Sequence, residues 1–164
     1  MRENTCTICG LRPHKLPGNM DLSQLEQCIE QEIQKSIEQG YRTFLTGAAM
    51  GVDLWASEIV LQCKEENPSV QLVCFQPCET QAEKWPLEWR TLYYSIIQQS
   101  DNTYCLQYQY TDDCMLRRNR IMVELSSKVI AVHDGRAEGG TAYTIDYARK
   151  HGTEIVIINP NDFC

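Results

Sequence analysis

The stretch Val129-Ile130-Ala131-Val132, followed by a loop that ends in Gly139-Gly140-Thr141, decides the fold. The four apolar, mostly β-branched residues are typical of a buried strand in a parallel sheet. From Thr141 to His151 apolar residues recur at helical spacing, which predicts an amphipathic helix. Free N–H groups at such a helix start attract anions, and Thr141 can cap the helix or bond a phosphate. A plain glycine-rich turn has the same composition, so the rest of the chain decides between the two interpretations.

The same alternation of strand and helix runs along the whole chain. Strands are expected at 5–9, 41–46, 70–75, 103–106, 128–133 and 154–158, with helices at 21–39, 52–64, 86–99, 115–126 and 142–151. Such alternation builds parallel β-α-β units with right-handed crossovers. The sequence therefore predicts an α/β fold with a mainly parallel sheet of about six strands.

Composition indicates one ordinary globular domain spanning residues 1–164. Hydrophobic residues make up 43% and charged residues 23% of the chain, and neither repeats nor a linker interrupts it. The sequence has neither a long apolar run nor a secretory signal at its start, so we expect a cytoplasmic protein that does not enter a membrane. The formal net charge of −7 disfavours nonspecific binding to nucleic acid or to a membrane surface.

The nine cysteines are expected to be reduced thiols. Cys6 and Cys9 form a C-x-x-C pair, and Cys74 and Cys78 a C-x3-C pair, which together have the ligand number of a zinc site. Cys6 falls within an expected strand, whose side chains alternate between faces, and this placement disfavours a zinc knuckle. We therefore predict no metal.

The loop from Thr46 to Asp53 follows the second expected strand. Its small residues permit close approach of a ligand to the backbone and present N–H groups to an anion. Asp53 has two interpretations: it interacts favourably with the helix dipole, or it accepts hydrogen bonds from ribose hydroxyls. The glycine spacing matches neither a dinucleotide fingerprint nor a P-loop, which disfavours a dinucleotide oxidoreductase and a P-loop NTPase.

Positive charge is concentrated at Arg117-Arg118-Asn119-Arg120. Arg117 and Arg118 continue the apolar stripe of their helix toward its start, so we expect at least one of them in a pocket, where a guanidinium binds phosphate bidentately. The alternative is a solvated helix face. Arg12, which follows Gly10, lies either at the same cleft or on the open surface.

Two further side chains carry open interpretations. Trp85 stands at a helix start, where it packs in the core or stacks on a base. Glu138 precedes the two glycines, where it is either a solvated loop residue or a general acid or base.

Together these residues resemble the YpsA-like proteins, a bacterial family of unknown function in the SLOG superfamily. The resemblance is carried by Gly10-x-Arg12-Pro13, Thr46-Gly47-x3-Gly51-Val52-Asp53, Gln81-x3-Trp85, Ser100-Asp101, Arg118-Asn119-Arg120-x-Met122-Val123 and Asp134-Gly135-x3-Gly139-Gly140-Thr141. It implies a Rossmann-like three-layer α/β/α sandwich with a pocket for a nucleotide. Cys9 replaces a threonine that is frequent in such proteins, so one hydroxyl contact is lost.

The resemblance and the loops together define an expected ligand site. The expected ligand is a nucleotide or an ADP-ribose-like derivative, and no other cofactor is expected. The residues expected to bind it are Gly10, Arg12, Thr46, Gly47, Gly51, Asp53, Arg117, Arg118, Asn119, Gly139, Gly140 and Thr141.

Three functions compete for this site. The first is a sensor or regulatory module that reports ligand binding to a protein partner or to a second copy of the chain. The second is a LOG-like N-glycosidic nucleotide hydrolase, with Glu138 or Asp146 as its carboxylate. Such hydrolases carry Gly-Gly-x-Gly-Thr-x-x-Glu, whereas Thr144 stands at the glutamate step here. The third, a DprA-like binder of single-stranded DNA, is disfavoured by the acidic composition.

Overall fold

The computed structural model describes residues 2–164, which form one six-stranded, all-parallel sheet. The strand order is β4-β3-β2-β1-β5-β6. This arrangement confirms the predicted α/β, Rossmann-like fold. The strands are β1 (Thr5–Gly10), β2 (Thr43–Thr46), β3 (Gln71–Gln76), β4 (Asn102–Cys105), β5 (Lys128–Val132) and β6 (Glu154–Ile158).

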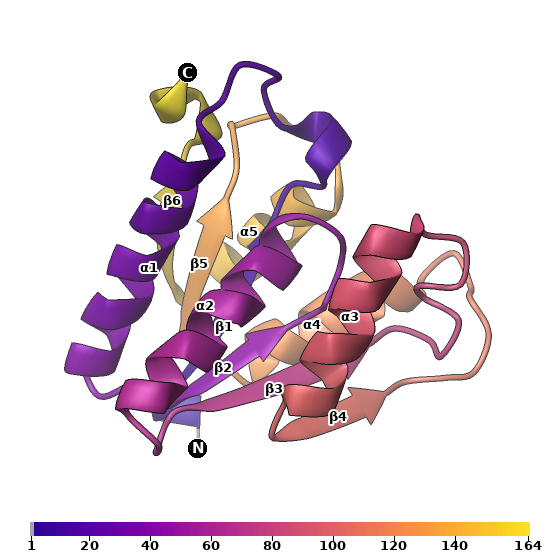
Figure 1. The fold of residues 1–164 in the computed structure, drawn as a ribbon, viewed down its shortest axis with the longest axis horizontal. Helices are drawn as coiled ribbons and strands as arrows, with labels where there is room; N and C mark the ends of the chain where they lie inside the picture. Colours follow the sequence, from indigo (N-terminus) through magenta and orange to yellow (C-terminus); the bar gives the residue numbers. More distant parts are fainter. Residues whose placement is uncertain (1) are drawn as a thin grey trace.

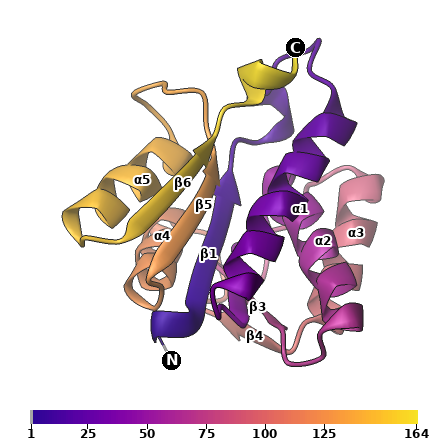
Figure 2. The ribbon, with the colours of Figure 1, turned by 90° about the vertical axis from the view of Figure 1, so that its left-hand side faces the viewer.

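Helices cover both faces of the sheet and complete the three layers (Figures 1 and 2). On one face lie α1 (Leu22–Glu38), α2 (Val52–Glu66) and α3 (Leu87–Gln99), and on the other lie α4 (Cys114–Glu124) and α5 (Gly140–Lys150). Short 3-10 turns occupy Arg2–Asn4, Pro13–Lys15 and Pro160–Phe163.

Alternate strand residues build a separate core on each side of the sheet. Phe44 and Ile130 pack beneath α1 and α2, whereas Leu45 and Val129 face α4 and α5. Because both faces of the sheet are covered, its central strands are apolar almost throughout, as the sequence predicts.

The direction of strand addition reverses between β1 and β5. From β1 the chain adds β2, β3 and β4 on one side, then returns through α4 to place β5 on the other side of β1. Gly10 at the end of β1 pairs with Val132 at the end of β5. In open parallel sheets a ligand cleft forms outside the carboxyl ends at such a reversal.

The start of α5 differs from the sequence-based expectation. The helix begins at Gly140 with Gly139 as its N-cap residue, so Thr141 lies inside the first turn and does not cap it. Gly139 has a φ of 109°, a conformation that favours glycine and lets the helix start immediately after it. The other element boundaries shift by a residue or two, as is usual where helix and strand ends are read from a pattern.

Three further features of the described chain bear on its chemistry. No helix between Arg2 and Cys164 is long and apolar enough to cross a bilayer. Each cysteine is a free thiol. Within the same residues, no group of three or more His, Cys, Asp or Glu side chains is arranged to hold a metal ion.

Candidate functional site

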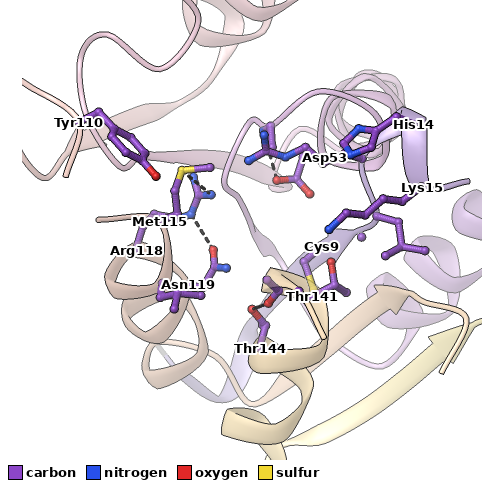
Figure 3. Close-up of a pocket in the computed structure, with 17 residues that line it drawn as sticks. Cys9, His14, Lys15, Asp53, Tyr110, Met115, Arg118, Asn119, Thr141 and Thr144 are labelled. Atoms are coloured by element: carbon purple, nitrogen blue, oxygen red, sulfur yellow. Dashed lines mark hydrogen bonds between the residues drawn. The ribbon is translucent and has the colours of Figure 1, made fainter. Parts of the chain in front are cut away.

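A cavity of about 410 Å³ opens at the reversal between β1 and β5 (Figure 3). Its walls come from the end of β1, the 3-10 turn that follows, and the starts of α2, α4 and α5. The structure brings many of the expected ligand residues together here. Those that line the cavity are Gly10, Arg12, Asp53, Arg118, Asn119, Gly139, Gly140 and Thr141.

Hydrogen-bond donors converge on the two glycines at the start of α5. A Cβ atom on Gly139 would lie 3.3 Å from Nζ of Lys15, and one on Gly140 would lie 3.9 Å from Nδ2 of Asn119. Figure 3 shows Lys15 reaching into the cavity from the side opposite Asn119. An ammonium group, an amide nitrogen and the positive end of a helix therefore border one space, an arrangement that suits an anion.

Arg118 is the most strongly held side chain of the site. Only 3% of it is exposed, and its Nη1 donates to the carbonyl oxygens of Gly47 at 2.7 Å and Phe75 at 3.0 Å. Its Nε donates to Oδ1 of Asn119 at 2.7 Å, which leaves the amide nitrogen of Asn119 for the glycines. Burial lowers the pKa of the guanidinium, and Asp53 opposes that shift.

Only glycine fits at position 47, because the guanidinium of Arg118 lies against its backbone. A Cβ atom there would sit 2.5 Å from Cζ of Arg118, well inside van der Waals contact. Its carbonyl oxygen also accepts a bond of 3.1 Å from Nε2 of Gln81. Gly47 therefore does not line the cavity, and instead it admits and anchors the arginine.

Asp53 is the buried carboxylate of the cavity. Its Oδ2 accepts a bond of 3.2 Å from the N–H of Ala49, so the carboxylate folds back over its own loop. Burial raises the pKa of Asp53, whereas Arg118, the Ala49 N–H and Arg12 lower it. Burial is the largest of these effects, so the pKa of Asp53 is raised overall. In either protonation state its side chain keeps acceptor capacity for a ligand hydroxyl.

Other expected residues support the cavity from outside. Thr46 lies beneath the loop, where its hydroxyl accepts from the N–H of Ala48 at 3.1 Å. Gly51 has a φ of 93°, and a Cβ atom there would lie 2.8 Å from Cδ of Pro13. Arg117, by contrast, does not line the cavity; it is partly buried and forms an ion pair of 3.8 Å with Asp113.

The two carboxylates considered for catalysis, Glu138 and Asp146, are both exposed, and neither lines the cavity. Asp146 instead forms an ion pair of 3.8 Å with Arg149. It borders a different cavity, on the β6 side of α5.

Sequence reasoning missed several residues that line the cavity, including His14, Lys15, Tyr110 and Met115. Lys15 follows Arg12 and Pro13 on the loop after the first strand. Its position next to Arg12 is the only feature of the sequence that indicates a place at the cavity. Tyr110 lies on the loop before α4, where no periodicity tells which way a side chain points.

Arg136, on the loop before α5, forms an ion pair within that loop and a hydrogen bond to the segment that carries Lys15. Arg136 bonds both carboxylate oxygens of Asp134, at distances from 2.6 to 3.1 Å. Its Nη2 also donates to the carbonyl oxygen of Lys15 at 3.1 Å. The hydrogen bonds from Arg136 lower the pKa of Asp134 to about 2.

The family model described as the YspA SLOG family matches residues 6–163. The chain belongs to this family. Among its relatives, a UPF0398 protein of Halalkalibacterium halodurans is 27% identical over 166 residues, covering 95% of this chain and 88% of that protein. A UPF0398 protein of Bacillus cereus is 28% identical over 152 residues, covering 88% and 82%.

Solved structures of the DNA processing protein DprA share the fold of this SLOG protein. The Streptococcus pneumoniae protein aligns with a TM-score of 0.63 and 18% identity, over 93% of this chain and 50% of that one. The Helicobacter pylori protein, described for its single-stranded DNA binding mode, aligns with a TM-score of 0.62 and 17% identity, over 93% and 64%. This chain thus spans half of the Streptococcus pneumoniae protein and 64% of the Helicobacter pylori protein.

Replacing Arg118 tests its structural role in this SLOG protein. Arg118→Leu removes the buried donor to the backbone carbonyls of Gly47 and Phe75, of which Gly47 keeps its bond from Gln81, and it leaves Asp53 without its buried counter-charge. We therefore expect a loss of about 2–4 kcal/mol in the free energy of unfolding. Arg117→Leu, one residue earlier and only partly buried, should change it by less than about 0.5 kcal/mol. Urea denaturation measures both, and equal losses in the two variants would refute the role.

The pair of Asp134 and Arg136 predicts a pH dependence. Because the folded pKa of Asp134 is depressed to about 2, below the ordinary value of about 3.9, its contribution to stability is present above pH ~4 and is lost as the pH falls toward 2. Arg136→Gln should return this pKa toward about 3.9 and, because the pair is near solvent, change stability at neutral pH only slightly. Carboxyl NMR titration measures the pKa, and an unchanged value in the variant would contradict the assignment.

Proposed function

We propose that this protein binds a nucleotide or an ADP-ribose-like ligand, with the ligand's phosphates at Gly139-Gly140-Thr141. The observation that carries the proposal is the convergence of Lys15, Asn119 and the start of α5 on one glycine-lined space. The net charge of the chain is −7, so donors and cations gathered around a cavity stand out against an acidic surface. Phosphate is the common biological anion that such a space suits.

The opposite wall supports a sugar next to the phosphates. Asp53 lines that wall as an acceptor for ribose hydroxyls, and Arg12 adds charge near it. The cavity volume of about 410 Å³ lies within the range of about 300–1,000 Å³ usual for small-molecule sites.

Binding fits the site better than hydrolysis does. Glu138 and Asp146 are exposed and lie outside the cavity. Thr144 stands at the step where LOG-like hydrolases carry glutamate, and its hydroxyl donates to the carbonyl oxygen of Gly140 at 2.8 Å. We therefore propose a cytoplasmic sensor or regulatory role, in which a protein partner or a second copy of the chain responds to the occupied site.

A DNA-binding role is the second candidate, and the fold shared with the Helicobacter pylori DprA is what favours it. The acidic net charge opposes it, because single-strand grooves need extended positive charge along the backbone path.

Isothermal titration calorimetry with ADP and with ADP-ribose tests the proposal. Lys15→Gln removes a charge-assisted donor from the phosphate space, so we expect its dissociation constant to rise about tenfold or more. Lys35→Gln, an exposed lysine on α1, is the matched control and should bind like the wild type.

Two further readouts separate the alternatives. Release of free base from the nucleotide, followed by chromatography, would favour the hydrolase. Binding of an oligothymidine strand with no heat from either nucleotide would favour the DNA-binding role. Absence of heat with both nucleotides at millimolar concentration would refute nucleotide binding.

A further inference from the structure

A second cavity of about 320 Å³ adjoins the first one. Arg12, Tyr110 and Met115 line both cavities, so the two share a wall. In Figure 3, Tyr110 and Met115 lie on the side of the first cavity away from Lys15. A ligand that starts at the glycines can therefore extend past Arg12 into the second cavity.

The second cavity offers flat aromatic and apolar surface. Trp85 lines it and is half-buried, and its ring packs edge-on against Tyr93 with 5.2 Å between centroids. Tyr110, which is 60% exposed, provides a second ring at the shared wall. Aromatic rings bind the faces of nucleobases by stacking, whereas the glycines and cations of the first cavity suit phosphate.

Gln81 adds a directional polar group to this wall. Its Nε2 donates to the carbonyl oxygen of Gly47, so the side-chain amide is held in one orientation. Its Oε1 is buried and has no hydrogen-bond partner among residues 2–164. A buried acceptor without a partner costs free energy. An amino group of a ligand beside Gln81 would relieve that cost by donating to it, whereas a keto oxygen would not.

We infer that the second cavity is the base subsite of the ligand and that it selects an amino-bearing purine, adenine, over hypoxanthine. The inference rests on the proposed function, because the phosphates at Gly139-Gly140-Thr141 place the other end of the ligand. Trp85 and Tyr110 contact the base face, and Gln81 accepts from its exocyclic amine. Arg12 lies at the junction between base and phosphates.

Tryptophan fluorescence during titration with ADP tests the position of the base. Stacking on Trp85 should quench the emission of the wild type, and Trp85→Phe should abolish the change because the remaining tryptophans lie elsewhere. Trp89→Phe is the matched control and should keep the quench, since Trp89 packs on Trp55 and lines neither cavity. Trp85→Ala should weaken ADP binding about tenfold through lost stacking.

Calorimetry with IDP and with inorganic pyrophosphate tests the selectivity. We expect IDP to bind about tenfold more weakly than ADP, and Gln81→Met to remove most of that difference. Pyrophosphate should bind without quenching Trp85, and more weakly than ADP.

The possible failures are distinguishable. If pyrophosphate binds as tightly as ADP and no quench depends on Trp85, the base subsite is wrong and the phosphate site stands. If ADP and IDP bind equally to the wild type, the assigned role of Gln81 is wrong. If neither pyrophosphate nor ADP binds at millimolar concentration, the proposed function fails and the base subsite fails with it.

Discussion

The site depends on the hydrogen bonds of one buried guanidinium. Arg118 joins the carbonyl oxygens of Gly47, on the loop after β2, and Phe75, on β3, to helix α4. Through its Nε it also sets the orientation of Asn119 toward the start of α5. One side chain therefore fixes the relative positions of the loops that surround the cavity, and its loss would free several of them together.

Because Arg118 and Asp53 are both buried, their charges depend on each other. Burial raises the pKa of Asp53 and lowers that of Arg118, while each of the two groups opposes the shift of the other. A buried charge without a partner is strongly destabilising, so replacing either residue alone would leave the other uncompensated. The carbonyl oxygen of Gly47 extends these interactions, because it accepts from Gln81 as well as from Arg118. The polar support of the first cavity thus continues to the wall of the second.

The fold could be read from the sequence because strands and helices have periods that show in the pattern. The position of the cleft followed from topology, since parallel strands bring their carboxyl ends to one edge. The sequence did not show which of Arg117 and Arg118 faces the cavity. Adjacent helical residues point about 100° apart, and the apolar stripe of α4 does not decide between them. The structure buries Arg118 and leaves Arg117 only partly buried.

The hydrophobic pattern of the sequence did not predict where the loop side chains of the two cavities lie. Lys15, Tyr110 and Gln81 contribute to the cavities from segments without regular periodicity, so their directions depend on tertiary contacts such as the bond from Arg136 to the carbonyl of Lys15. Thr46 and Gly51 were expected to contact a ligand, and the structure places them where they shape the loop instead. A glycine in a motif can therefore be needed because a neighbouring side chain occupies the space of its Cβ atom, as Arg118 does at Gly47.

The most direct measurement of the central claim is the backbone amide NMR spectrum of the protein during titration with ADP. The account predicts that the amide signals of Gly140 and Thr141, at the start of α5, shift progressively and saturate, because phosphate oxygens accept from this helix start. Unchanged signals there, with shifts confined to the cavity that Asp146 and Arg149 border, would contradict it.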